Sequence, residues 1–312
     1  MKEVSALTAI INSDHLFSRS RKLQRQQTRV SYLFLLPALL FFFIFVVFPM
    51  GMGIYTSFFN YTMSGFSFIG IANYGELFSD PVFRQSVVNT LVIVVASVPL
   101  VAAFSLWVAT VIYQKKPFSR SFYRGVFYLP VVMGSVPVVV VWKWVFNQYY
   151  GILNWFLQTA SVLAPNARIN WLGDSMYAIW CILAILFSTS IGQPIVLYVA
   201  SLGNVDAAQI EASQVDGASK WQTFIHVKWP SLVPTTLYVL VITTINSFQC
   251  FALIQLLTNG GPSGSTSTVM YYLYETAFKL YRYGYANAMG VILAILIALF
   301  SALQFRVMRT SD

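Results

Sequence analysis

Neutral polar side chains gather near the middle of two apolar stretches of the 312-residue chain, around residues 188–194 and 243–249. Hydroxyl and amide groups offer hydrogen bonds without trapping a charge, which is what a pathway for a neutral polyol or sugar requires. The candidate residues for such a pathway are Ser188, Ser190, Gln193, Thr243, Asn246, Ser247 and Gln249. The same residue types also hydrogen-bond between packed membrane helices, so both interpretations stay open for each residue.

A second group of residues lies in the polar segment 203–230. Asp206 is suited to cap a short helix over Ala207–Val215, and Gly217 allows a turn after it. A second short helix is expected to reach about Lys228 and to end before Pro230. Such a helix–turn–helix could dock a partner protein. An amphipathic connector is the alternative, and the pattern alone slightly favours it.

The cysteines and histidines form no pattern that predicts catalysis or metal binding. Cys181 and Cys250 lie in apolar runs and are expected to be small buried side chains. Neither His15 nor His226 has the carboxylate neighbours that acid–base or metal chemistry needs. The G-x-x-x-x-G-K-[ST] phosphate loop is absent from the sequence. We therefore expect no catalytic residue, metal site or bound cofactor in this chain, which argues against a membrane-embedded enzyme.

The elements that position these residues are predicted to be membrane helices. Hydrophobic residues make up 57% of the chain and charged residues only 9%, against about 25% charged in soluble domains. This composition excludes an ordinary soluble enzyme and a disordered chain. Six stretches are long and apolar enough to span a bilayer; they cover about residues 32–58, 87–113, 122–146, 177–202, 234–257 and 286–304. The predicted fold class is an all-α membrane protein, with a transmembrane domain over 31–310 after a basic cytoplasmic tail, 1–30.

Basic residues predict the orientation, since cytoplasmic loops are rich in Lys and Arg. Of the 19 Lys and Arg residues, 14 lie in one set of segments. This set consists of the two terminal tails, the 113–122 loop with the neighbouring Arg124, and the 203–230 loop. Both termini and the 203–230 loop are therefore expected in the cytoplasm. The net charge of +9 is then a topology signal, and no nucleic-acid partner is expected. The middle of each span lacks charged residues, which argues against a proton-coupled pump.

The 203–230 loop resembles the EAA loop of permease subunits of bacterial ABC importers. That motif reads E-A-A, three residues, G, nine residues, I, one residue, L-P. The matching residues here are Glu211, Ala212, Ser213, Gly217, Val227, Trp229 and Pro230, with no gap in the spacing. Ser213, Val227 and Trp229 depart from the motif, and Trp229 is the largest departure because it is bulkier than Leu. The run Asp216–Ala218 also resembles the family.

Further segments resemble the carbohydrate-importer subgroup of these permeases, of the maltose, glycerol-phosphate and oligosaccharide type. One is the LT-x-GGP, Y-x-x-Y-x-x-A-F and GYA-x-A series within Leu256–Gly290. The others are FIGIANYGELFSDPVFRQSVVNTL (68–91) and FYLPVVMGSVPVVVVWKWVFNQYYGILN, in and after the third stretch. Together they cover most of residues 30–305. The spans offer no basic residue for an anionic substrate, which favours a neutral sugar over glycerol phosphate.

The resemblance implies the mechanism and the partners. It implies a type I ABC importer permease fold in the bacterial cytoplasmic membrane, where the chain pairs with a second homologous permease as a heterodimer. Two cytoplasmic ATPase subunits would bind ATP and Mg, and an extracytoplasmic solute-binding protein would deliver the carbohydrate. Membrane lipid surrounds such a protein. The implied ATPase-coupling residues are Asp206, Glu211, Ala212, Ser213, Asp216, Gly217 and Ala218, within a 206–226 loop.

The resemblance also bears on the turn Asn259–Pro262 after the fifth stretch. It places Gly260, Gly261 and Pro262 near an outer gate or the docking face of the binding protein. A plain chain reversal is the alternative, and the turn signal alone favours that alternative. A secondary transporter or a channel is the remaining rival for the whole chain, but it would need coupling-ion ligands or a selectivity ring and would have no use for an EAA loop.

Overall fold

The computed structural model describes residues 28, 30–164 and 166–309. The chain divides into two compact units, Met1–Tyr55 and Thr56–Asp312. A long apolar helix begins at Val30 in the first unit and ends at Thr56, the first residue of the second. It contains a π-helical segment η1 (Phe43–Val47) followed by α2 (Phe48–Thr56). Nearly all of the predicted basic tail lies outside the described residues.

The second unit begins with a β-hairpin and a short helix. Strands β1 (Phe59–Thr62) and β2 (Gly65–Phe68) pair antiparallel, with Phe59 opposite Phe68. The buried Asn73 amide in α3 (Ala72–Ser79) donates to the carbonyl oxygens of Ser57 and Phe59, at 2.7 and 3.0 Å. This amide therefore fixes α3 against the start of the hairpin.

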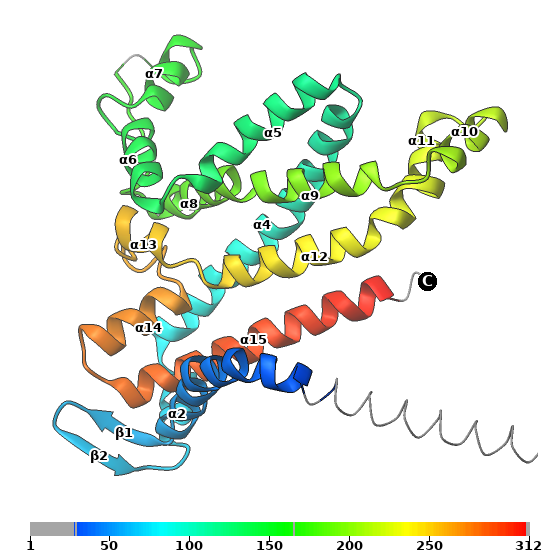
Figure 1. The fold of residues 1–312 in the computed structure, drawn as a ribbon. Helices are drawn as coiled ribbons and strands as arrows, with labels where there is room; N and C mark the ends of the chain where they lie inside the picture. Colours follow the sequence, from blue (N-terminus) through cyan, green and yellow to red (C-terminus); the bar gives the residue numbers. More distant parts are fainter. Residues whose placement is uncertain (1–27, 29, 165, 310–312) are drawn as a thin grey trace, which may run out of the picture. The chain divides into compact units, whose positions relative to one another are not determined.

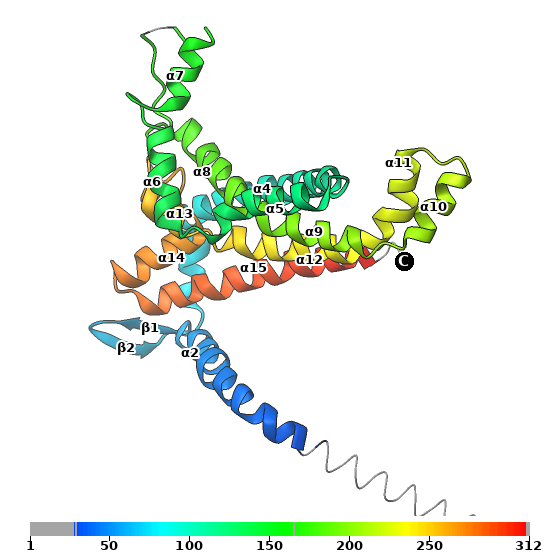
Figure 2. The same ribbon diagram turned by 45° about the horizontal axis from the view of Figure 1, so that its top comes forward.

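Long apolar helices form the centre of the second unit. They are α4 (Pro81–Tyr113), the consecutive pair α8 (Ser175–Ser190) and α9 (Gly192–Gly203), α12 (Trp229–Phe248) and α15 (Tyr283–Arg309). Helix α4 packs on α9 and α12, and α12 also packs on α15, as Figures 1 and 2 show. Fully buried side chains such as Ile195, Tyr198 and Leu232 fill these contacts. In the described part, five helices are long and apolar enough to cross a membrane, or six if one bent pair counts as a span.

That bent pair corrects the third predicted stretch. Instead of one helix over 122–146, the chain forms α5 (Pro117–Val132) and α6 (Ser135–Val145), bent by 97°. Residues 133 and 134 have extended backbones with ψ of 130° and 160°. Pro137 then lies in the first turn of α6, where a missing N–H costs nothing, whereas inside a continuous helix its ring would clash with the carbonyl four residues before it. The short α7 (Ile152–Thr159) follows.

The fifth predicted stretch is also divided. Helix α12 ends at Phe248, and a separate α13 (Ala252–Leu257) follows. The Thr268 hydroxyl donates to the carbonyl oxygen of Cys250 at 2.9 Å and accepts from the Tyr271 N–H, so it caps α14 (Val269–Phe278) as well. A side chain from the following loop thus satisfies the Cys250 carbonyl, which a continuous helix would have paired.

Candidate functional site

The 203–230 loop folds into two helical arms joined by a turn. Helix α10 (Ala207–Val215) has the bounds that the sequence predicts, and the Asp206 carboxylate caps it by accepting from the Ala208 N–H at 2.9 Å. At its other end, Gly217 takes a φ of +78°, and the Ala218 N–H donates to the Ser213 carbonyl at 2.9 Å. This glycine-terminated helix end starts the turn between α10 and the second arm, which begins at Lys220.

The second arm differs from the prediction that it ends before Pro230. Helix α11 (Lys220–Thr223) starts with a capping box between Ser219 and Gln222 and continues through the π-helical segment η2 (Phe224–Lys228) directly into α12. Pro230 therefore lies near the start of α12 and does not terminate the helix. The wider π turn before it accommodates the ring and the missing N–H.

The two arms are tied together by polar contacts. The hydroxyls of Ser213 and Thr223 lie 3.1 Å apart, and Thr223 is buried. Ser213 replaces the second alanine of the EAA motif, so this departure supplies a hydrogen bond that alanine could not make. This contact joins the two arms, which lie at one end of α9 and α12 (Figure 1).

The outer face of α10 is free to meet another molecule. Glu211, Ala212, Asp216 and Gly217 are exposed, and the Val215 side chain is 87% exposed. Glu211 makes no hydrogen bond or ion pair with any residue that the structure describes. This face therefore presents Val215 beside the carboxylates of Glu211 and Asp216, with room for a partner to contact them.

Four of the predicted pathway residues line one cavity. Ser190 and Gln193 come from the α8–α9 junction and Thr243 and Asn246 from α12, around a volume of about 110 Å³. Thr189 and Tyr238, which the sequence analysis did not select, line it as well. The cavity offers hydroxyls and amides and no charged side chain.

The other three pathway candidates lie elsewhere. The Ser188 hydroxyl donates to the Ile185 carbonyl of its own helix at 2.8 Å. Ser247 is buried, and its hydroxyl lies 2.8 Å from that of Ser97 in α4, so it joins two helices. Gln249 lines a separate cavity between α6, α8 and α13.

The turn at Asn259–Pro262 packs against α14. The Tyr271 hydroxyl donates to the Asn259 carbonyl at 2.9 Å, and the Thr266 hydroxyl donates to the Gly261 carbonyl at 2.7 Å. Gly260 has a φ of +79°, and an added Cβ there would lie 2.7 Å from the Tyr271 ring. The turn is therefore a fixed part of this end of the molecule.

A carboxylate network near this turn was not selected from the sequence. Asp80 accepts hydrogen bonds from the hydroxyls of Tyr272 (2.7 Å) and Tyr285 (2.8 Å) and caps α4 through the N–H groups of Val82 and Phe83. Burial opposes ionisation of Asp80, but these four donors outweigh it, so its pKa lies below the ordinary value of 3.8. The Asp80-Pro81 pair was the available sequence signal, since Asp is favoured at the N-cap and Pro at the next position.

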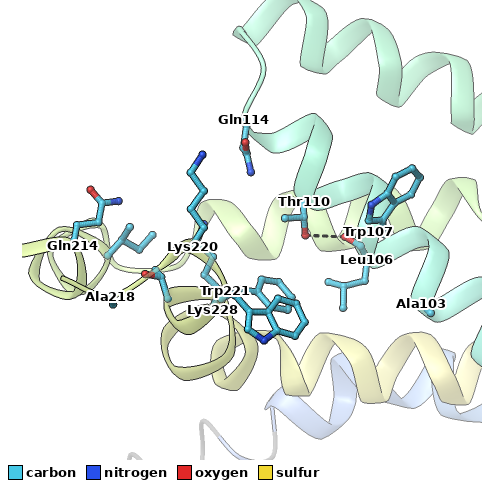
Figure 3. Close-up of a pocket in the computed structure, with 13 residues that line it drawn as sticks. Ala103, Leu106, Trp107, Thr110, Gln114, Gln214, Ala218, Lys220, Trp221 and Lys228 are labelled. Atoms are coloured by element: carbon cyan, nitrogen blue, oxygen red, sulfur yellow. Dashed lines mark hydrogen bonds between the residues drawn. The ribbon is translucent and has the colours of Figure 1, made fainter. Parts of the chain in front are cut away.

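A larger pocket of about 880 Å³ separates α4 from the 203–230 loop. Figure 3 shows its lining, with Trp107, Thr110 and Gln114 on α4 and Lys220 and Trp221 on the loop. The α4 residues follow a helical spacing that was visible in the sequence, but nothing local connected them with residues more than 90 positions away.

The chain is similar in sequence to known membrane transport proteins. Residues 79–310 match the family described as binding-protein-dependent transport system inner membrane component. The chain is 32% identical over 290 residues to the probable ABC transporter permease protein YurN of Bacillus subtilis (strain 168), covering 91% of this chain and 98% of that protein. It is 32% identical over 276 residues to the multiple sugar-binding transport system permease protein MsmF of Streptococcus mutans serotype c, covering 88% of this chain and 93% of that protein.

A solved structure shares the fold. It is a chain in the crystal structure of a bacterial ABC transporter involved in the import of the acidic polysaccharide alginate, with a TM-score of 0.79 at 23% sequence identity. The match covers 91% of this chain and 96% of that chain.

Proposed function

The chain belongs to the family of binding-protein-dependent transport system inner membrane components, and from this premise we propose that it is a pore subunit of an ATP-driven sugar importer. It is a multi-pass protein of the cytoplasmic membrane, and in this family separate ATPase subunits hydrolyse ATP. The proposed cycle is alternating access, in which closure of the ATP-bound ATPases shifts the permease toward an outward-open state.

A neutral sugar or oligosaccharide is the proposed substrate. Relatives with sugar-importer names, such as MsmF, support the substrate class. The cavity lined by Ser190, Gln193, Thr243 and Asn246 supports it chemically, because its polar lining residues are all uncharged. At about 110 Å³, it is smaller than the roughly 300–1,000 Å³ of typical ligand pockets. A second, homologous permease would therefore supply the remainder of the pathway.

The exposed face of α10 is the observation that carries the coupling role. Val215 is held out of the protein by a helix that is capped at Asp206 and closed by Gly217. We assign this face to the ATPase, with Glu211, Ala212, Asp216 and Ala218 around it. The ATPase would bind ATP and Mg. The Asn259–Pro262 turn lies at the other end of the bundle and is proposed to face the solute-binding protein.

Co-purification tests the proposal. A tagged chain is solubilised from native membranes and the proteins bound to it are identified by mass spectrometry. We expect a second permease and an ATPase with a phosphate-binding loop, and we expect Val215→Asp to reduce ATPase recovery, because a buried carboxylate at the interface is costly to desolvate.

Val162→Asp is the matched control, since Val162 is 71% exposed and lies in the segment after α7, away from the 203–230 loop. It should leave ATPase recovery unchanged. A wild-type chain that brings down no ATPase under any mild condition would overturn ATP coupling and reopen the channel alternative. Equal recovery of the ATPase with Val215→Asp and with the wild type would show that α10 is not part of the interface with the ATPase.

A further inference from the structure

The pocket between α4 and the 203–230 loop changes character along its length. Its α4 wall carries Ala103, Leu106 and Trp107 at one end, then Thr110, and Gln114 at the other. These positions recur at helical spacing and share one face. They extend over about 16 Å at 1.5 Å per residue, from apolar surface to the polar end of the span.

The pocket carries uncompensated positive charge. Lys220 and Lys228 are among its lining residues, and no Asp or Glu is among the described ones. Neither lysine forms an ion pair with any residue in the described ranges. In Figure 3 the Lys220 side chain extends into the space between the loop and Gln114.

Two exposed indoles complete the pocket. Trp107 on α4 is 63% exposed, and Trp221 on the loop is 69% exposed and stacks on Phe224. Tryptophan is enriched at the boundary between the hydrocarbon and the headgroups of a bilayer. The pocket thus combines an apolar part on α4, two indoles and two lysines.

We propose that this pocket binds one anionic phospholipid of the cytoplasmic leaflet. The acyl chains would lie along Ala103 to Trp107, and Lys220 and Lys228 would bind the phosphate group. A basic pocket beside membrane helices on the cytoplasmic side suits an anionic headgroup. The chain's own N-terminal tail fits poorly, because it is rich in Arg and Lys and would be repelled by the same two lysines. The inference takes from the proposed function only the cytoplasmic orientation of the loop.

Lipid retention tests the inference directly and does not depend on transport. The tagged complex is delipidated, incubated with vesicles of phosphatidylcholine and phosphatidylglycerol in equal parts, and repurified, and the lipid bound per chain is measured by mass spectrometry. We expect selective retention of phosphatidylglycerol. The double variant Lys220→Gln/Lys228→Gln should lower its affinity by roughly 30-fold, since each lysine near the surface contributes a factor of about five.

Two further variants separate this site from general surface charge. Lys115→Gln/Lys116→Gln removes two exposed lysines after the same end of α4, outside the pocket, and should retain phosphatidylglycerol normally. Ala103→Trp fills the apolar part and leaves both lysines in place, so it should also reduce retention. Equal loss from both lysine pairs, no preference for phosphatidylglycerol in the wild type, or cross-linking of Trp107→Cys to the second permease would each overturn the proposal.

Discussion

Gly217 determines the path of the chain between α10 and α11 through its own backbone. Its φ is +78°, yet an added Cβ would meet no atom within 4 Å. The obstacle to other residues is therefore the left-handed conformation, which costs an L-residue roughly 1–2 kcal/mol. A nine-residue helix such as α10 is marginal without its contacts, so this strain is expected to open the turn.

We expect Gly217→Val to abolish ATP-coupled sugar uptake while the amount of protein in the membrane stays normal. Gly217→Asn is the control, because asparagine tolerates this conformation, and it should keep most of the uptake. Uptake assays beside immunoblots of membrane fractions measure both quantities. Normal uptake with valine would show that the turn geometry is not needed for coupling.

Asp80 joins three helices through one carboxylate, because it caps α4 and accepts from tyrosines of α14 and α15. Its pKa is lowered in the folded protein. The stabilisation by the carboxylate is therefore complete above the ordinary pKa of 3.8 and is lost as the pH falls through the lower folded value. The network should loosen only in acid.

Asp80→Asn and Asp80→Ala separate the charge of this residue from its capping role. Asparagine still caps a helix, whereas alanine loses the cap at a cost of about 1 kcal/mol. We expect the thermal midpoint of the purified protein at neutral pH to fall for both variants, and further for alanine. The drop in thermal midpoint that we expect for the wild type in acid should be smaller in both variants. An unchanged acid profile in Asp80→Asn would assign that drop to other carboxylates.

Helices α5 and α9 approach each other closely at Gly192. A Cβ added there would overlap the Phe127 carbonyl oxygen and lie 2.8 Å from the Val131 side chain. Small residues permit such close packing between membrane helices. Gly192→Ala should therefore force α5 away from α9 and destabilise the protein by about 1–3 kcal/mol.

Thermal unfolding of the detergent-purified protein measures this effect. Gly203→Ala is the matched control on the same helix, because its Cβ would make an ordinary contact 3.8 Å from the Tyr113 ring. It should unfold at or above the wild-type temperature. If Gly192→Ala and Gly203→Ala unfold at the same temperature, α5 and α9 can move apart without a loss of stability.

Local signals explain which elements could be predicted. The bounds of α10 follow from a capping residue and a terminal glycine that are both within the segment. The breaks after Val132 and Phe248 lie within stretches that are apolar on average over 20 residues, so a hydropathy average does not detect them. The second break depends on Thr268, 18 residues further along the chain. The 880 Å³ pocket likewise needs side chains from distant segments, and the sequence shows only that each segment is amphipathic.

For the whole molecule, the bent pair α5–α6 decides how many times the chain crosses the membrane. Helix α5 has 16 residues, about 24 Å at 1.5 Å per residue, which is short of the ~30 Å hydrocarbon core. If the pair were re-entrant, the basic 113–122 and 203–230 loops would face opposite sides, against the preference of Lys and Arg for the cytoplasm. We therefore expect α5 and α6 to make one crossing together, for six in total.

Accessibility of single cysteines on either side of the pair measures this. Lys116→Cys precedes α5 and Tyr150→Cys, at a side chain that is 80% exposed, follows α6. The native Cys181 and Cys250 are buried and should not react with a membrane-impermeant maleimide. We expect Tyr150→Cys to be labelled in intact spheroplasts and Lys116→Cys only after permeabilisation. Labelling of both from the same side would make the pair a re-entrant loop and place α10 and the N-terminus on opposite sides of the membrane, which would exclude an ATPase dock at α10 unless the N-terminal tail lies outside the cell.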